Sequence, residues 1–293
     1  MINGLINIYK PTGITSNKAL GILKYALRQL NIKVKVGHMG TLDPLATGVL
    51  PVALGRATRL FDYSLNKKKI YEAEFIFGAE SVSLDTDTEV IYKNIPDLSV
   101  DDIKKSTQKL IGEIEQIPPI FSAKSINGVR AYKLARNGEI PELKPKKIII
   151  YNIYEIKKTD KNKFKMLIEC SSGTYIRSIA RDIAYELNTT AVMSSLVRLK
   201  SGIFEVNNSC SLDEISLNPQ IIYDKLIPMS EYLQELPIVK IDETEINKVM
   251  NGVKINKPNI LIGELYATYY NENLIGIGTN DISNMFYIKT WLL

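Results

Sequence analysis

Cysteine and histidine are scarce in this chain, whose 293 residues include two Cys and one His. Cys170 and Cys210 lie far apart in the sequence, and neither has a second Cys or a His close by. A disulfide framework requires paired cysteines, and a zinc site requires closely spaced Cys or His ligands. The sequence therefore predicts neither a disulfide framework nor a metal site.

Long apolar runs are absent as well. The sequence has no stretch of about 18 apolar residues that could cross a bilayer. The opening MINGLINIYKPTG also lacks the basic, apolar and small-residue succession of a signal peptide. We therefore expect a cytoplasmic protein without a membrane partner.

An excess of charge of one sign is nearly absent, since 37 Lys and Arg face 32 Asp and Glu, for a net charge of +5. So small an excess is a weak indication of a polyanionic partner. The distribution is more informative, because residues 122–147 hold seven basic and two acidic residues. On composition alone, this segment fits a solvated face as well as a contact with a polyanion.

Local patterns predict both strands and helices. Alternating apolar and polar residues over 71–77 predict a half-buried strand, and 147–157, 163–170 and 196–206 resemble further strands. A helix is expected after Thr15, with an apolar stripe reaching Leu30, and another over 174–187. Because these elements alternate irregularly, the pattern favours an α/β fold of the mixed α+β kind over a doubly wound sheet.

The pattern of the sequence changes near residue 235. Before it, the chain reads as one large domain over 1–234; after it, short strands punctuated by Gly follow one another to the last residue. This change predicts a small, mainly β unit over 235–293.

The stretch GHMGTLDPLATGVLPVALG holds Asp43 and the single histidine, His38, with no other ionisable residue. Asp43 before Pro44 is typical of a helix N-cap, which would place a helix over 45–54. Alternatively, a carboxylate in an apolar, Gly-rich loop needs a cation to remain ionised. Both interpretations stay open on the sequence alone.

Arg177 is the candidate cation. It falls in the first turns of the 174–187 helix, where the helix dipole disfavours positive charge, so its position suggests an acidic partner. The plainer interpretation is a solvated stripe with Arg181. Tyr71 is similarly ambiguous, since a tyrosine at a strand end can belong to the core or stack on a base. His38 lacks the companions that a metal site or a Ser/His/Asp triad requires.

Longer motifs carry a resemblance to a known family. GHMGTLDPLATGVLPVALGRATRLF resembles the signature of the TruB family of bacterial tRNA pseudouridine synthases. The resemblance runs over roughly residues 4–205, through YKPTGITS, KIYEAEFIFG, QIPPIFSAKSINGVRAYKLARNGE, SSGTYIRSIARDIA and SSLVRLKSGIF. Two positions depart from the family's usual pattern: Ser81-Val82-Ser83 replaces Thr-Asp-Thr, and Val197-Arg198 replaces Arg-Arg.

The resemblance implies a pseudouridine synthase domain with a central mixed, largely antiparallel sheet flanked by helices, followed by a small PUA-like domain. It also implies that the uridine at position 55 in the tRNA T loop is flipped out and isomerised. Isomerisation adds and removes nothing, so no cofactor is expected. The partner would be the T-loop stem-loop of tRNA, bound by a monomer without an obligate protein partner.

Residue roles follow from the same resemblance. Asp43 would be the catalytic aspartate, Tyr71 would stack on the flipped uracil, and Arg177 would pair with Asp43. RNA or base contacts are implied for His38, Leu196 and Lys10. Within an RNA-gripping insertion at about 118–147, where a short helix is expected from Arg130, further contacts are implied for Lys124, Arg130, Lys133 and Arg136.

Two other functions remain open at this point. The protein could act chiefly as an RNA-folding helper that binds without chemistry. It could also be a nucleoside or glycoside hydrolase, although glycosidases usually need two carboxylates and the Asp43 loop offers one.

Overall fold

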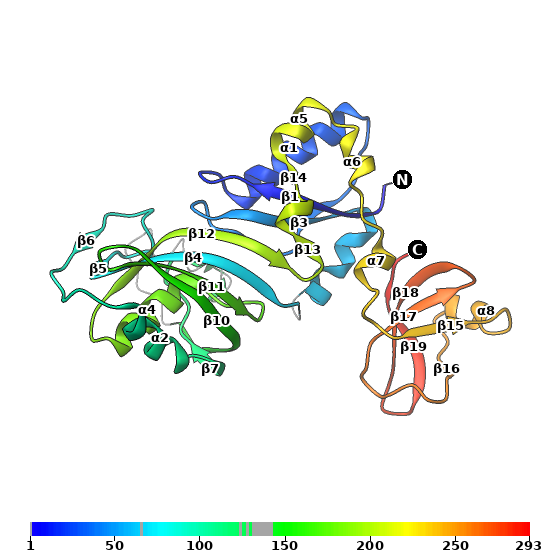
Figure 1. The fold of residues 1–293 in the computed structure, drawn as a ribbon. Helices are drawn as coiled ribbons and strands as arrows, with labels where there is room; N and C mark the ends of the chain where they lie inside the picture. Colours follow the sequence, from blue (N-terminus) through cyan, green and yellow to red (C-terminus); the bar gives the residue numbers. More distant parts are fainter. Residues whose placement is uncertain (1, 65–66, 123–124, 127–128, 131–142) are drawn as a thin grey trace.

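A ten-stranded mixed sheet dominates the described part of the chain, which comprises residues 2–64, 67–122, 125–126, 129–130 and 143–293 of a computed structural model (Figure 1). Its main strand order is β14-β1-β3-β12-β4-β11-β10-β7, with β13 paired to β12 and β2 to β3. Most pairs are antiparallel; β1 with β14 and β3 with β12 are parallel. The strands are β1 (Gly4–Lys10), β2 (Val36–His38), β3 (Thr47–Leu54), β4 (Lys69–Phe77), β7 (Gly112–Gln116), β10 (Lys146–Asp160), β11 (Lys163–Cys170), β12 (Ala191–Ser201), β13 (Phe204–Glu205) and β14 (Cys210–Ser211).

Helices cover both halves of this sheet. α1 (Ser16–Gln29) packs with α5 (Leu212–Leu217) beside β1, whereas α2 (Val100–Gln108) packs with α4 (Ile176–Glu186) against β10 and β12. The Thr15 side chain accepts a hydrogen bond from Lys18 N and caps α1, as its sequence position predicts. Shorter elements are η1 (Gly55–Ser64), β5 (Ala79–Glu80), β6 (Ile91–Tyr92), η2 (Val206–Asn208), α6 (Ile221–Asp224) and α7 (Met229–Tyr232).

The mixed fold class and most strand predictions are confirmed. Residues 163–170 form β11, and 71–77 lie within β4. The strand expected over 196–206 begins earlier, at Ala191, and a turn at Gly202 separates β12 from β13.

The helix considered over 45–54 is wrong, because Thr47–Leu54 is the buried strand β3. β3 lies between β1 and β12, so its backbone groups find partners in neighbouring strands rather than along a helix. Local propensity gave no sign of these partners, which lie tens of residues or more away.

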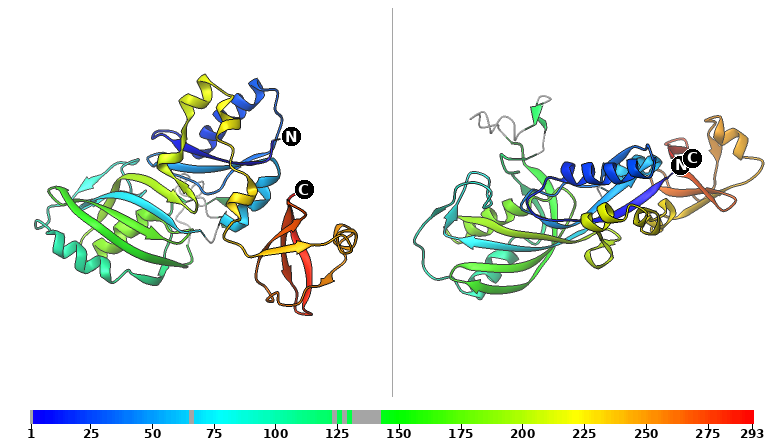
Figure 2. Two further views of the ribbon diagram at one scale, coloured as in Figure 1. Left: turned by 45° about the vertical axis from the view of Figure 1, so that its right-hand side comes forward. Right: turned by 90° about the horizontal axis from the view of Figure 1, so that it is seen from above.

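The predicted insertion is described in part. Val129–Arg130 (β9) pairs with Ser125–Ile126 (β8), so these two residues form a strand where a helix was expected. This pair projects away from the main sheet (Figure 2, right view). Lys124, Lys133 and Arg136 lie outside the described residues, and the side chain of Arg130 is not described, so their RNA contacts stay predictions.

A second sheet of five strands is built from residues 238–291, in the order β15-β17-β18-β19-β16. Its elements are β15 (Ile238–Ile241), α8 (Ile246–Met250), β16 (Ile255–Asn256), β17 (Tyr266–Tyr270), β18 (Asn273–Asn280) and β19 (Met285–Trp291). An apolar cluster joins the two sheets. It includes Leu5, Val49 and Phe204 from the first part of the chain and Ala267, Ile277 and Leu292 from the second.

Two hydrogen bonds tie the end of β19 to η1. Arg59 Nη1 donates to the carbonyl of Trp291 at 2.6 Å, and the hydroxyls of Tyr63 and Thr290 lie 2.7 Å apart. Separately, no helix within the described ranges is long and apolar enough to cross a membrane.

Gly48 permits the close approach of β3 to β12. Its φ is +99°, and a Cβ there would lie 2.3 Å from the backbone oxygen of Arg198. We expect Gly48→Ala to lower the free energy of unfolding by more than about 1 kcal/mol, measured by urea denaturation. Gly21→Ala in α1 is the control; it meets no atom within 4 Å and should be stabilising by about 0.5–1 kcal/mol. Equal stability of the two variants would contradict this account of β3.

Candidate active site

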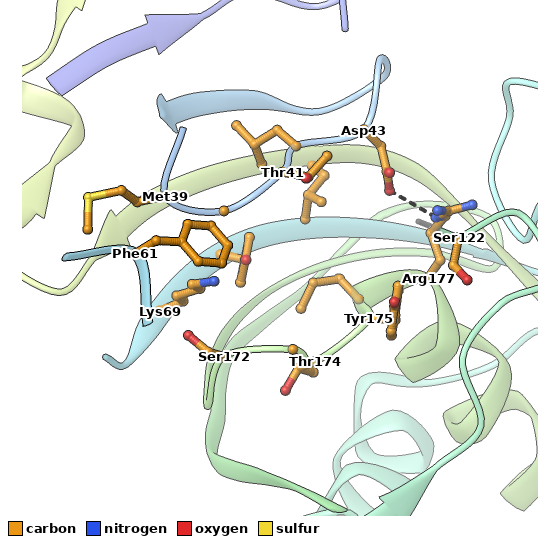
Figure 3. Close-up of a pocket in the computed structure, with 16 residues that line it drawn as sticks. Met39, Thr41, Asp43, Phe61, Lys69, Ser122, Ser172, Thr174, Tyr175 and Arg177 are labelled. Atoms are coloured by element: carbon orange, nitrogen blue, oxygen red, sulfur yellow. Dashed lines mark ion pairs between the residues drawn. The ribbon is translucent and has the colours of Figure 1, made fainter. Parts of the chain in front are cut away.

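A cavity of about 240 Å³ opens where the β2–β3 loop, β4, β12 and the start of α4 meet (Figure 3). Four residues selected from the sequence line it together: Asp43, Tyr71, Arg177 and Leu196. Residues that lie up to about 150 positions apart in the sequence therefore converge on one site. His38 and Lys10 are not among the described residues that line it.

Arg198 holds the loop that carries Asp43. Its side chain is fully buried, and its guanidinium donates to three backbone carbonyls: Nε to Val49 at 2.6 Å, Nη2 to Gly40 at 3.1 Å and Nη1 to Thr41 at 3.4 Å. A planar fork with several donors suits this task better than an ammonium would. The sequence analysis mentioned Arg198 only in the Val197-Arg198 departure and assigned it no role.

Residues near the start of α1 hold the same loop from the other side. The Ser16 hydroxyl donates to the Leu42 carbonyl and accepts from the Leu42 amide, each at 2.9 Å. Thr12 Oγ1 donates to the Leu45 carbonyl at 3.0 Å. The loop is irregular, yet side chains from three other elements or turns hold its backbone polar groups.

Lys10 also belongs to this support, which corrects the RNA contact predicted for it. Its side chain is fully buried, and Nζ donates to the carbonyls of Pro11 at 2.8 Å, Ile14 at 2.7 Å and Pro44 at 3.3 Å. Burial lowers the pKa of Lys10 to about 8. An ammonium has three donors, and all three are engaged, so Lys10 positions the loop instead of facing RNA.

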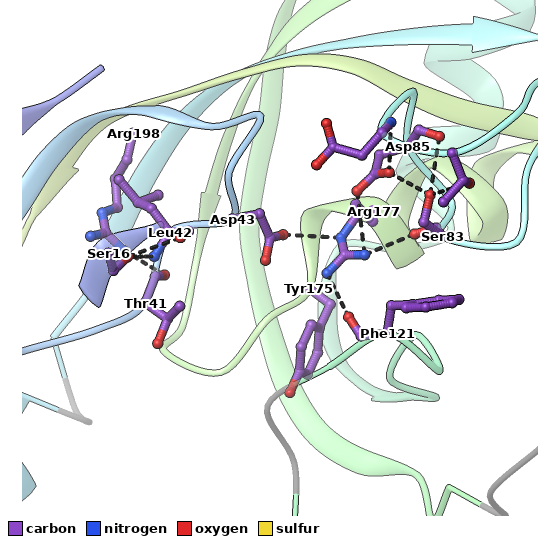
Figure 4. Close-up of polar contacts among 12 residues, drawn as sticks. Ser16, Thr41, Leu42, Asp43, Ser83, Asp85, Phe121, Tyr175, Arg177 and Arg198 are labelled. Carbon is purple, nitrogen blue, oxygen red and sulfur yellow. Dashed lines mark hydrogen bonds and ion pairs between the residues drawn. The ribbon is translucent and has the colours of Figure 1, made fainter. Parts of the chain in front are cut away.

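Arg177 lies between two carboxylates (Figure 4). Its Nε is 3.0 Å from Asp43 Oδ2, and its Nη1 is 3.3 Å from Asp85 Oδ2. The same guanidinium donates to the carbonyls of Ser83 at 2.8 Å and Phe121 at 2.9 Å. The Asp85 side chain is 3% exposed and that of Asp43 is 35% exposed, so one carboxylate is structural and the other remains accessible.

The placement of Arg177 at a helix start is now explained. It is the second residue of α4, where the helix dipole alone would disfavour a cation, but the two carboxylates compensate. Gln116 on β7 fixes this helix end, because its side chain accepts from Tyr175 N at 2.8 Å and donates to Tyr175 O at 3.2 Å. Asp85 and Gln116 escaped the sequence analysis, since no short-range pattern connects them to Arg177.

Tyr71 lines the cavity from the buried face of β4 and is 6% exposed. Burial raises the pKa of its phenol, and neighbouring Arg198 opposes this rise only in part. Tyr71 is therefore protonated near neutral pH. Its ring offers a flat apolar surface, whereas its hydroxyl must lose its own proton before it can accept another.

His38 ends β2 and is half-buried. Burial, together with the nearby Arg198 cation, lowers the pKa of its imidazole, so the ring is neutral near pH 7. Its buried Nδ1 has no hydrogen-bond partner among the described residues. Contact of His38 with RNA stays a prediction.

Known proteins resemble this chain along most of its length. Residues 27–176 match the family model described as TruB family pseudouridylate synthase (N terminal domain). The tRNA pseudouridine synthase B of Clostridium kluyveri is 38% identical, over 99% of this chain and 100% of that protein. The proteins of the same name from Clostridium tetani and Staphylococcus aureus are also 38% identical, covering 98% and 88% of this chain and 99% and 86% of theirs.

Solved structures resemble the fold. A chain in the crystal structure of a Cbf5-Nop10-Gar1 complex superposes with a TM-score of 0.75 at 24% identity, covering 99% of this chain and 85% of that one. A chain in the structure of an H/ACA RNP bound to a substrate RNA containing 2'-deoxyuridine gives 0.73, also at 24% identity, with the same coverage. At this level of identity, the similarity concerns the fold.

The double ion pair predicts a large cost for losing its cation. Arg177→Met should lower the free energy of unfolding by about 3–5 kcal/mol, because the buried carboxylate of Asp85 would lose the cation that faces it. Arg181→Met is the matched control on the same helix; the Arg181 side chain is 34% exposed, and its loss should cost less than about 1 kcal/mol. Denaturant unfolding measures both.

A double variant, Arg177→Met with Asp85→Asn, should regain part of the lost stability, since it removes the unpaired charge. If Arg177→Met were no less stable than Arg181→Met, the pairing of Arg177 with Asp85 would not contribute to stability.

Proposed function

The chain belongs to the TruB family of pseudouridylate synthases, and from this premise we propose that it converts the uridine at position 55 in the T loop of tRNA into pseudouridine. One observation carries the proposal to the residue level. Asp43 is held by Arg177 at 3.0 Å on the wall of a cavity that also contains Tyr71. A carboxylate, its cation and an aromatic ring thus surround a single space.

The isomerisation of uridine to pseudouridine requires few chemical groups. The C1′–N1 bond of the uridine breaks, the uracil turns, and a C1′–C5 bond forms, so that nothing is added to the molecule or lost from it. One accessible carboxylate can start this sequence, and 35% of the Asp43 side chain is exposed. Arg177 supplies the positive charge that pairs with this carboxylate at 3.0 Å, beside apolar neighbours such as Met39 and Leu42, which are each 3% exposed.

The cavity suits a base that has been flipped out of folded RNA. Its volume of about 240 Å³ exceeds the ~150 Å³ that accommodates benzene in an engineered protein cavity. Uracil is a ring of the same size with two carbonyl groups. We assign Tyr71 to stack on this ring, Leu196 to pack against it, and His38 to contact the RNA near the position that the base leaves.

The remaining parts of the chain would hold the RNA. We assign residues 1–234 to the catalytic domain and 235–293 to a PUA-like RNA-binding domain. The insertion at about 118–147 would grip the T-loop stem-loop through Lys124, Arg130, Lys133 and Arg136. The enzyme would act as a monomer in the cytoplasm.

A hydrolase would need more acids than this cavity offers. Among the described residues that line it, Asp43 is the sole Asp or Glu. Glycosidases generally use two carboxylates on opposite sides of the scissile bond. Asp85 does not fill this role, because it is 2% exposed and engaged by Arg177 and Ser83. The arrangement therefore supports an isomerase better than a hydrolase.

We expect Asp43→Asn to abolish pseudouridine formation and to leave folding and tRNA affinity near the wild-type level, because the carboxylate acts in the chemistry. Pseudouridine at position 55 and release of free uracil are measured on the same tRNA. Asp62→Asn, which changes an exposed aspartate, is the control. Free uracil from the wild-type protein would identify a hydrolase. Full rescue of cells by Asp43→Asn would favour an RNA-folding helper.

Stacking by Tyr71 makes a separate prediction. Tyr71→Phe should retain the affinity for T-loop RNA, whereas Tyr71→Leu should lose about 1–3 kcal/mol of base stacking, measured as an increase in Kd. The turnover of the Phe variant then reports on the hydroxyl alone. Equal affinities of the Phe and Leu variants would exclude Tyr71 as the stacking surface.

A further inference from the structure

Lys69 is a charged residue on the buried face of a strand. It opens β4, two residues before Tyr71, and the strict alternation of buried and half-buried positions places both side chains on the same face. Lys69 is 9% exposed and lines the cavity. In Figure 3 its side chain points into the cavity beside Phe61, at the end opposite to Asp43 and Arg177.

Within the described part of the chain, the ammonium of Lys69 has no hydrogen-bond or ion-pair partner. Of the neighbouring groups, Arg198 acts most strongly and lowers the pKa of Lys69, followed by the Cys170 thiol, which raises it, and by Lys146, which lowers it. Lys69 Nζ and Arg198 Nη1 lie 3.3 and 3.6 Å from the point that a Cβ on Gly40 would occupy. Burial, followed by repulsion from Arg198, lowers the pKa of Lys69 to about 8, which leaves it mostly charged at neutral pH.

A buried cation without a partner is costly, and the cost is recovered when an anion or a strong acceptor enters. We propose that Lys69 donates a hydrogen bond to carbonyl O4 of the flipped uracil and stabilises the negative charge that this oxygen gains during the reaction. This inference rests on the proposed pseudouridine synthase activity, and it assigns the far end of the same cavity to binding O4 of the uracil.

The position of Lys69 favours the base over the RNA backbone. A flipped nucleotide inserts its base first, and its phosphates stay at the mouth of the site in contact with water. Lys69 lies nine-tenths buried, at the far end from Asp43. If the ribose C1′ lies at Asp43, N1 of the base is near it, and O4 is the acceptor across the ring.

The electron balance places charge on O4 by each route. When the C1′–N1 bond breaks, its electron pair leaves with the base and spreads over N1, O2 and O4. If Asp43 instead adds to the base at C6, the displaced pair also reaches O4. C5 then bonds to C1′ and loses its proton, and N1 takes up a proton.

Lys69 can donate a hydrogen bond to a carbonyl both before and after the base turns. Rotation about the N3–C6 axis exchanges N1 with C5 and O2 with O4, so the same ammonium meets a carbonyl before and after the turn. Cytosine carries an amino group in place of O4. Because an ammonium donates and cannot accept, that amino group would face a cation without a hydrogen bond, and the site would reject cytosine.

The test pairs Lys69→Met with a change of the substrate atom. Single-turnover rates are measured at saturating T-loop RNA that carries either uridine or 4-thiouridine at the target position. Sulfur accepts hydrogen bonds weakly, and its intrinsic effect on the base cancels when the two enzymes are compared. We expect Lys69→Met to slow the uridine reaction by about 10²-fold. The ratio of the uridine rate to the 4-thiouridine rate should fall by about tenfold or more in the variant.

Two controls separate this role from a structural one. Lys165→Met removes a lysine that pairs with Glu72 on the opposite face of β4, and it should change neither rate. Lys69→Met should be at least as stable as the wild type in denaturant, because methionine of similar volume removes a buried charge. Lys69→Arg, which keeps a donor, should retain part of the dependence on O4.

Three outcomes would overturn the inference: a uridine rate of Lys69→Met near the wild-type value, an unchanged ratio between the two RNAs, or loss of RNA affinity with a weaker salt dependence for both RNAs. The last outcome would assign Lys69 to a phosphate instead. If the wild-type protein forms no pseudouridine at all, the proposed function itself fails, which is a distinct result.

Discussion

The site depends on one constraint: an irregular loop that enters the protein interior must have its backbone polar groups paired. The β2–β3 loop has no ladder of its own at Asp43, and side chains take over that task. Arg198 binds the carbonyls of Gly40 and Thr41, and Ser16 binds both polar groups of Leu42. The conformation of the loop is therefore held by side chains from β12 and α1.

The charged side chains around the cavity differ in how they are paired. Arg177 serves two carboxylates, of which Asp85 is buried and Asp43 is partly exposed, so the pair fixes the guanidinium and leaves one acid for chemistry. Arg198 donates hydrogen bonds to three backbone carbonyls. Lys69 has no such partner among the described residues, which makes the far end of the cavity electropositive. An acid thus lies at one end and an unpaired cation at the other, as a base whose electrons move from N1 toward its carbonyls requires.

The sequence predicted what local periodicity and charge logic can reach. The strand expected over 163–170 matches β11 in full, and the misfit of a cation at a helix start identified the partner of Asp43. The helix prediction for residues 45–54 failed because the pairing of β3 with β1 and β12 overrides a helix-like stretch. Asp85 and the burial of Lys10 depend on contacts between distant segments, which no local pattern encodes. Lys69 was within reach, since the alternation that revealed Tyr71 places a charge on the buried face.

The two hydrogen bonds between η1 and β19 have a consequence for biosynthesis. η1 carries Phe61, a residue of the cavity wall, and its partners Thr290 and Trp291 follow more than 200 residues later in the chain. At a translation rate of about 5–20 residues per second, roughly 10–50 s separate the two ends of this contact. During that interval the nascent polypeptide can form the Asp43 loop and β4 but not the clasp on η1. This wall can therefore be completed only after residues 290 and 291 have been synthesised and have left the ribosome.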